Sequence, residues 1–314
     1  MSQLFALLFP GQGSQHLGML GALEKKQPLV RETFYEASSV LGYDLWQLIQ
    51  DGPQEKLDQT QFTQPALLAA DVAIFRCWEA LGGPLPQTMA GHSLGEYAAL
   101  VCAKALNFID TIQLVENRGR YMQEAVPNGK GAMGVIIGLN KSRIEIICKR
   151  LTQSAVTMVR PANLNSPIQT VISGNASGVD CALALAKTEG AKVAKRISVS
   201  VPSHSPLMQT AAERLARDLD EITVNSPEIS VIHNTDVSEH RGSKAIRNAL
   251  VKQLVDPVRW VETIQKMVKQ GIKFFGECGP GNKLAGLNKR IERQSETFPL
   301  ITTELILAAI ERVK

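Results

Sequence analysis

The chain has 314 residues, of which 44% are apolar and 20% charged, and its net charge is +4. A chain of this length and composition can bury a large core, so the sequence is that of an ordinary globular protein and not of a disordered or fibrous one. The small basic excess is spread along the whole chain, which argues against a nucleic-acid-binding face and is compatible with an acidic protein or an anionic substrate.

Apolar runs alternate with segments of helical periodicity, a pattern typical of an α/β fold with a mainly parallel sheet. The apolar start of the chain is too short and too poor in basic residues for a signal peptide, and we expect a buried strand there. In chain order the first elements should be a strand over Phe5–Phe9, a helix over 64–81, a strand over Thr88–Ala90, and helices over Leu94–Leu106 and 111–125.

Residues 131–200 show a different order of elements. Their pattern predicts strands over Gly131–Leu139, Val156–Leu164, Gln169–Gly174 and Lys192–Ser200, with helices over Lys141–Leu151 and Ala176–Glu189. The resulting order, βαββαβ, is that of a ferredoxin-like domain. We therefore expect residues 130–200 to form a small domain inserted into a large one that comprises residues 1–129 and 201–314.

The cysteines and the apolar runs indicate the cellular compartment in which the protein is expected. The five cysteines are scattered and include no CxxC pair, which argues against a disulfide framework and against a zinc site. No apolar run reaches the roughly 20 residues that a membrane-spanning helix needs. We expect a cytoplasmic protein that binds neither a metal nor a membrane.

The strongest local signal is Gly91-His92-Ser93-Leu94-Gly95, which has the pattern G-x-S-x-G. It follows a predicted strand and precedes a predicted helix, which is the context of a nucleophile elbow. The glycines permit a tight turn, and the free N–H groups at the start of a helix can stabilise a negatively charged oxygen. We predict that Ser93 is a nucleophile, the alternative being an incidental serine in a glycine-flanked turn.

A serine nucleophile needs a base, and the chain has five histidines. His92 adjoins Ser93, and the turn should point its ring elsewhere, whereas His240 lies in a polar segment where we expect contact with solvent. His204 follows the last predicted strand of the small domain, in a loop of prolines and small residues at the junction of the two domains, where ligand sites often form. We favour His204 over His233 as the base.

Placing residues 111–125 on a helix separates two arginines. Arg118 shares an apolar face with Val115 and Met122, whereas Arg120 falls on the polar side. An arginine stays charged, so a buried one needs an anionic partner, and its planar group matches a carboxylate through two parallel hydrogen bonds. Arg118 is therefore a candidate for binding an acidic substrate. The alternatives are an arginine that reaches out to solvent or one that pairs with an acidic residue of the protein.

Five segments, in the same order, resemble the signature motifs of malonyl-coenzyme A:acyl carrier protein transacylases and related polyketide acyltransferase domains. They are Phe9–Gln15, Thr63–Ala66, Gly91–Tyr97, Val201–Met208 and Glu277–Gly281. Any one of them alone would be weak, but together they are highly specific. In this family a hydrolase-like large domain carries a ferredoxin-like insertion, which agrees with the order of elements predicted above.

The resemblance implies the catalytic roles. Ser93 would carry the acyl group as an ester, and His204 would act as general base and acid. The backbone N–H groups of Gln12 and Leu94 would form the oxyanion hole. A backbone carbonyl close to Gln253 would orient the histidine, in place of a carboxylate.

The resemblance also implies the substrates. Arg118 would bind the malonyl carboxylate, with Gln253 and His92 as further substrate-binding candidates. The substrates would be malonyl-coenzyme A and the phosphopantetheine thiol of an acyl carrier protein, and no metal or other cofactor would be needed. The turn around Gln12 is not a dinucleotide-binding fingerprint, because His16 stands where its third glycine would be.

The sequence thus predicts a monomeric malonyltransferase of fatty acid biosynthesis that works by a ping-pong mechanism. Three alternatives remain open. A trans-acting acyltransferase of a polyketide synthase would use the same chemistry with another carrier. A serine hydrolase such as a thioesterase would use water and would not need Arg118. A non-catalytic scaffold that binds the carrier would not need the intact Ser93 and His204.

Overall fold

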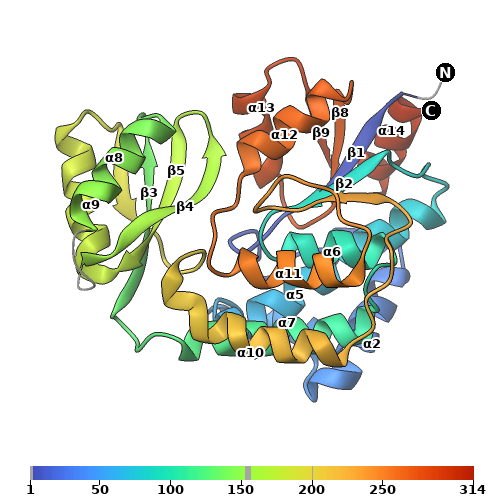
Figure 1. The fold of residues 1–314 in the computed structure, drawn as a ribbon. Helices are drawn as coiled ribbons and strands as arrows, with labels where there is room; N and C mark the ends of the chain where they lie inside the picture. Colours follow the sequence, from blue (N-terminus) through green and yellow to red (C-terminus); the bar gives the residue numbers. More distant parts are fainter. Residues whose placement is uncertain (1–2, 153–156, 200) are drawn as a thin grey trace.

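The computed structural model describes residues 3–152, 157–199 and 201–314 (Figure 1). Five strands form the larger sheet in the order β7-β2-β1-β8-β9, and each neighbouring pair runs parallel. They are β1 (Phe5–Phe9), β2 (Thr88–Gly91), β7 (Ser230–Ile232), β8 (Phe274–Glu277) and β9 (Glu296–Pro299). Every residue of the central strand β1 is buried, as expected for a parallel sheet covered on both faces.

Helices cover both faces of this sheet (Figure 1). They are α1 (Gly21–Glu24), α2 (Leu29–Leu41), α3 (Leu45–Asp51), α4 (Gln54–Leu57), α5 (Thr60–Ala80), α6 (Gly95–Cys102), α7 (Phe108–Glu124), the 3-10 helix η2 (Pro206–Met208), α10 (Gln209–Glu221), α11 (Ser243–Gln253), α12 (Trp260–Lys269), α13 (Lys283–Ile291) and α14 (Thr303–Val313). Successive residues of β1 point to opposite faces: Leu7 belongs to the core with α5 and α6, and Leu8 to the core with α12. None of the described helices is long and apolar enough to cross a membrane.

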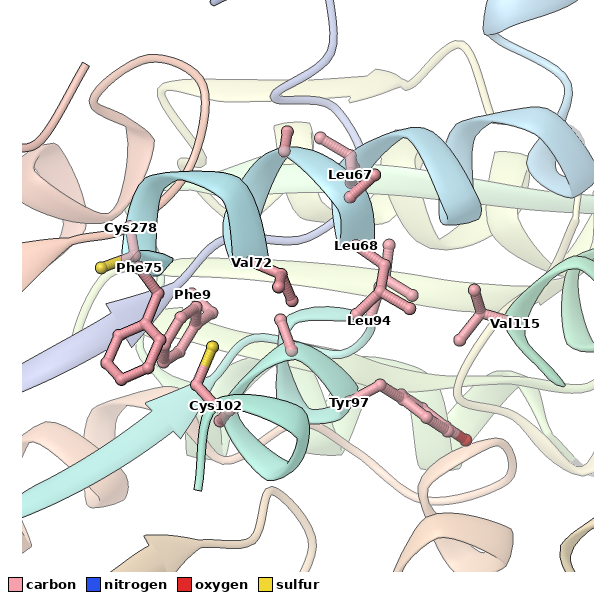
Figure 2. Packing of buried hydrophobic residues seen from close by; sticks show 14 of the residues in the cluster. Phe9, Leu67, Leu68, Val72, Phe75, Leu94, Tyr97, Cys102, Val115 and Cys278 are labelled. Atoms are coloured by element: carbon pink, nitrogen blue, oxygen red, sulfur yellow. The ribbon is translucent and has the colours of Figure 1, made fainter. Parts of the chain in front are cut away.

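The larger core lies between the sheet and α5. Figure 2 shows its centre, where Phe9 of β1 lies beside Phe75 of α5, and Leu68 lies farther along the same helix near Leu94 of the turn before α6. The helix predicted over 64–81 begins four residues earlier, at Thr60. Pro65 is the reason for this error: proline favours a first turn, but here it lies inside the helix. This apolar packing holds the start of α6 rigidly against the sheet.

The smaller sheet is antiparallel and has the strand order β4-β5-β3-β6. Its strands are β3 (Gly131–Ile137), β4 (Val159–Ser166), β5 (Gln169–Asn175) and β6 (Val193–Arg196), and a separate core joins it to α8 (Lys141–Leu151) and α9 (Ala176–Thr188). The predicted βαββαβ order is confirmed; the predicted strand limits at Val156 and Ser200 lie outside the described residues.

Several predicted elements end earlier than expected. The strand predicted over Lys192–Ser200 ends at Arg196, and residues 197–199 are not part of a strand. The helix after the elbow ends at Cys102, not Leu106, because Lys104 adopts a left-handed conformation with φ of 59°. The N–H of Ala105 then donates to Leu100 O, and that of Lys104 to Val101 O, the pattern of a Schellman cap. Glycine usually occupies this position, so its absence hid the end of the helix from the sequence pattern. Likewise β3 ends at Ile137, just before Gly138, whose φ is 107°.

Two glycines let β2 pass directly into α6. A Cβ on Gly95 would lie 2.1 Å from Phe9 O, and one on Gly91 would lie 1.8 Å from the carbonyl carbon of Gly95. Both distances are far below contact, so no side chain fits at either position. The start of α6 therefore lies directly against the end of the central strand.

We predict that Gly95→Ala destabilises the protein by about 3 kcal/mol or more, because the added methyl group must displace backbone in a packed core. Urea unfolding would measure the loss. Gly286→Ala is the matched control: its nearest neighbour would be Arg290 Nη1 at 3.7 Å, on an exposed turn of α13. This control should leave stability unchanged or raise it by up to about 1 kcal/mol. Equal stability of the two variants would contradict the packing argument.

Candidate active site

Ser93 lies at the turn between β2 and α6 in a left-handed conformation, with φ of 54°. This conformation is uncommon for a residue other than glycine and needs support from its surroundings. Asn234, just after β7, supplies it: its Oδ1 accepts from the N–H of Ser93 at 2.8 Å, and its Nδ2 donates to Gly91 O at 2.6 Å. The turn is thus held from the neighbouring strand, and the serine hydroxyl is presented at the carboxyl edge of the sheet.

His204 lies beside this hydroxyl. Its Nε2 is 2.8 Å from Ser93 Oγ, and its Nδ1 is 2.6 Å from the carbonyl oxygen of Gln253 at the end of α11. A carbonyl can only accept, so Nδ1 must carry the proton, and Nε2 keeps a free lone pair that can accept the proton of Ser93. No described carboxylate pairs with His204. The arrangement is therefore a Ser–His pair oriented by the main chain.

The environment of His204 keeps its imidazole neutral. The side chain is only 2% exposed, and burial, followed by the charge of Arg118, lowers the pKa of His204 to about 3. Both effects disfavour the imidazolium form. At neutral pH the ring is therefore ready to accept a proton.

Arg118 is buried next to the serine, 1% exposed, whereas Arg120 is exposed, as the helical spacing predicts. Its helix, α7, begins after Asn107, whose side chain accepts from two N–H groups of the first turn. The guanidinium donates from Nη1 to Gln64 Oε1 at 2.6 Å and from Nη2 to Gln253 Oε1 at 3.0 Å. Its Nη2 also lies 3.5 Å from the hydroxyl oxygen of the serine.

No described acidic side chain forms an ion pair with Arg118, and its Nε–H has no partner among the described residues. Burial lowers the pKa of this guanidinium, because desolvation disfavours its charged form. A buried cation without an anionic partner is costly unless a ligand completes it. The site is thus suited to a ligand that carries a carboxylate.

Ser93, His204 and Arg118 line one small cavity of about 80 Å³. Its lining comprises Gln12, Gln64, His92, Ser93, Leu94, Arg118, Met122, Met133, Asn163, Ile197, Val199, Ser203 and His204. The small sheet contributes part of this wall through β3 and β4. A larger groove of about 500 Å³ runs between α8, β4 and Arg259, but it contains none of these groups. The smaller cavity is therefore the candidate site, because the nucleophile, the base and the buried arginine line its walls.

The other histidines have different partners. His92 lines the cavity, but its Nε2 is 2.8 Å from Asn165 Oδ1 on β4, and burial lowers its pKa. His233 is fully buried, with Nδ1 2.7 Å from Glu96 Oε1. His240 remains partly exposed to solvent, with a side chain that is 26% exposed, and its Nε2 lies 2.7 Å from Asp236 Oδ2.

Sequence reasoning missed three residues that hold the site together. Gln64 and Glu96 lie inside segments that carry the family resemblance, so position in a motif could have pointed to them. Asn234 is a single amide after a short strand and left no local signal. The described residues contain no cluster of three or more histidine, cysteine or acidic side chains that could hold a metal ion.

Comparisons with known proteins agree on one family. A family model described as an acyl transferase domain matches residues 6–295. A malonyl CoA-acyl carrier protein transacylase of Escherichia coli (strain K12) is 50% identical over 307 residues, covering 98% of this chain and 99% of its own. The one of Bacillus subtilis (strain 168) is 41% identical over 309 residues, covering 98% and 97%.

Solved structures give the same result. The malonyl CoA-acyl carrier protein transacylase of Coxiella burnetii has a TM-score of 0.98 and 68% identity, and the match covers 100% of this chain and 98% of that one. A malonyl-transacylase in complex with its type II polyketide synthase acyl-carrier protein has a TM-score of 0.97 and 50% identity, with 99% and 100% covered.

We predict that the base stays active in mild acid. A histidine of ordinary pKa would lose about tenfold in base activity one unit below 6.5. Because burial and Arg118 lower the pKa of His204 to about 3, acylation of Ser93 at pH 5.5 should stay within about twofold of its rate at pH 7.5. An acid limb near pH 6.5 in stopped-flow measurements would contradict this.

Arg118→Ala removes one cause of the depressed pKa, so the acid limb should move to higher pH when a neutral acyl thioester is the substrate. Protonation of His204 also affects the stability of the fold, which limits the pH range in which rates can be measured. The unfolded chain takes up the histidine proton near pH 6.5 and the folded chain only near pH 3, so His204 lowers stability as the pH falls between these values. Circular dichroism should confirm that the fold is intact at each pH.

Proposed function

The chain belongs to the acyl transferase family. We propose that it transfers a malonyl group from malonyl-coenzyme A to the phosphopantetheine thiol of an acyl carrier protein, for fatty acid biosynthesis. The observation that carries the proposal is a single cavity that holds Ser93, the neutral His204 beside it, and Arg118, which forms no direct ion pair with a described acidic residue. Nucleophile, base and carboxylate-binding group thus meet within reach of one small acyl group.

In the first half-reaction, Ser93 Oγ attacks the thioester carbonyl while His204 Nε2 takes its proton. The N–H groups of Gln12 and Leu94, which line the cavity, would donate to the oxygen that becomes negative. The tetrahedral intermediate collapses as its carbon–sulfur bond breaks. His204 returns the proton to the departing coenzyme A sulfur, which leaves a malonyl ester on Ser93.

In the second half-reaction, the thiol of the carrier attacks this ester. His204 Nε2 accepts the thiol proton and then passes it to Ser93 Oγ as the ester bond breaks. The carbonyl of Gln253 keeps the imidazole in the same tautomer throughout, since it holds Nδ1–H. One thioester is consumed and another is formed, so the reaction runs readily in both directions. The chemistry requires no metal and no redox cofactor.

The relatives support the choice of partners. A malonyl-transacylase of very similar structure is described in complex with an acyl carrier protein, and the curated relatives carry malonyl transacylase names. We assign catalysis to residues 1–129 and 201–314 and treat residues 130–200 as a small domain that completes the cavity wall. We place the enzyme in the cytoplasm, where both substrates of fatty acid synthesis would be present.

One observation favours a second candidate. The carrier in the similar complex belongs to a type II polyketide synthase. The same chemistry in this chain could therefore serve a polyketide carrier. Transfer rates to a fatty-acid carrier and a polyketide carrier, measured side by side, distinguish the two functions.

Mixing the protein with malonyl-coenzyme A should yield a malonyl adduct on Ser93, detected by intact mass and peptide mapping. Ser93→Ala should form none, and His204→Ala should slow adduct formation by about a hundredfold or more while remaining folded. A stable adduct also separates the transferase from a hydrolase, in which water would release the acyl group. Near-normal acylation in His204→Ala together with an inactive His233→Ala would reassign the base.

Arg118→Ala should reduce the ratio of malonyl to acetyl transfer by at least about tenfold. Malonyl loses a charge-assisted pair worth about 2–5 kcal/mol, whereas a neutral acyl group no longer leaves a buried guanidinium unpaired. Competition between the two coenzyme A thioesters measures this ratio. Arg120→Ala, on the exposed face, is the control and should leave it unchanged. If Arg118→Ala depresses both substrates equally, the arginine serves only the structure.

A further inference from the structure

The counter-charge of Arg118 lies behind an amide. The carboxylate of Glu96, fully buried on α6, is linked to the guanidinium through the side chain of Gln253. Gln253 Oε1 accepts from Arg118 Nη2 at 3.0 Å, and Gln253 Nε2 donates to Glu96 Oε2 at 2.9 Å. The order is therefore guanidinium, amide, carboxylate, and the two charges do not touch.

The surroundings fix the orientation of this amide. Its oxygen faces a group that can only donate, Arg118, and its nitrogen faces two acceptors, Glu96 Oε2 and the carbonyl oxygen of Ser93 at 3.0 Å. A flipped amide would place donor against donor and acceptor against acceptor. The Gln253 side chain is also fully buried and cannot turn to water instead. It is a fixed spacer between the two charges.

Glu96 has its own fixed partners. Its Oε2 also accepts from the N–H of Asn234 at 2.9 Å, and its Oε1 faces His233 Nδ1 at 2.7 Å. The other ring nitrogen of His233, Nε2, is buried without a partner among the described residues. A neutral ring with its proton on Nδ1 avoids burying an unpaired N–H. His233 then donates to Glu96 without neutralising it, so the negative charge remains available to balance Arg118.

We propose that Glu96 balances the buried charge of Arg118, and that the Gln253 amide is a positioning residue that preserves the preference of the site for acyl groups with a carboxylate by keeping these two charges apart. Glu96 balances the buried guanidinium in the free enzyme, and Gln253 holds that carboxylate out of contact with it. The guanidinium therefore keeps a donor free for the substrate, which a direct ion pair within the protein would occupy. The inference rests on the proposed malonyl transfer, because malonyl supplies the carboxylate.

Two substitutions test separately whether a negative charge near Arg118 is needed and whether it must stay out of contact with the guanidinium. Glu96→Gln removes the charge and can keep the contacts: its oxygen can accept from Asn234 and Gln253, and its amide can donate to the other tautomer of His233. Gln64→Glu adds a carboxylate in direct contact with Arg118 Nη1 and gives up only a 3.4 Å contact with Met122 Sδ. The double variant Gln64→Glu/Glu96→Gln keeps the net charge of the protein and moves it from behind the amide to the guanidinium.

The experiment measures the ratio of malonyl to acetyl transfer in competition, together with the melting temperature of each variant. Gln64→Glu and the double variant should both lose at least about tenfold in this ratio. Glu96→Gln should melt at a lower temperature but keep or raise the ratio, with a lower KM for malonyl-coenzyme A, because a fixed charge that repels the substrate carboxylate is gone. In the Glu96→Gln variant, acylation of Ser93 with malonyl should also raise the melting temperature more than acylation with acetyl does.

Glu277→Gln is the control for loss of a buried acidic side chain outside the cavity, since Glu277 is fully buried and bound to two N–H groups at the start of α13, and burial raises its pKa to about 7. It should leave the ratio unchanged even if it melts earlier. A folded double variant with the wild-type ratio, or a tenfold fall in Glu96→Gln, overturns the inference. If the double variant does not fold, the opposite responses of the two single variants decide the question. Absence of malonyl transfer by the wild-type protein would instead refute the proposed function.

Discussion

A buried positive charge, the guanidinium of Arg118, is the constraint around which the site is arranged. Burial in the apolar face of α7 removes water from this group, so it requires acceptors from the protein. Gln64 and Gln253 provide neutral ones. Because these acceptors are not charged, the guanidinium remains able to bind a substrate carboxylate. The same charge helps to keep His204 neutral, so one group influences both substrate preference and the readiness of the base.

The parallel sheet provides the geometry that this charge needs. Gln12 follows β1, Ser93 follows β2, and Asn234 follows β7, so all three lie at the carboxyl edge of neighbouring strands. Ligands bind at this edge in open parallel sheets, because the loops there converge. Helix α11 then brings Gln253 to the same place. Its main chain orients His204, and its side chain contacts Arg118, so a shift of this helix would disturb both groups together.

The smaller sheet closes the cavity from the other side. Met133 of β3 and Asn163 of β4 line it, and Asn165 holds the ring of His92. The edge strand β4 is also joined to the large part of the molecule, since Leu164 N–H donates to Val258 O and Val258 N–H donates to Ala162 O. These main-chain bonds give the cavity wall a defined position relative to the serine.

The sequence by itself determined those features that depend only on residues close together in the chain. The glycines around Ser93 require a tight turn, the helical spacing of α7 places Arg118 inward and Arg120 outward, and apolar periodicity gives the βαββαβ order. The residues alone favoured His204 over His233 as the base without excluding His233, whereas the role of Gln253 came from resemblance to a family.

Only the tertiary structure decided which distant groups meet. His204 lies 111 residues from Ser93, and Asn234 lies 141 residues from it, so no periodicity or spacing records either contact. The same holds for the pairing of His233 with Glu96, 137 residues apart, and for the spacer role of Gln253. Such contacts are set by how strands and helices pack, whereas a sequence pattern reports only which face of an element is apolar.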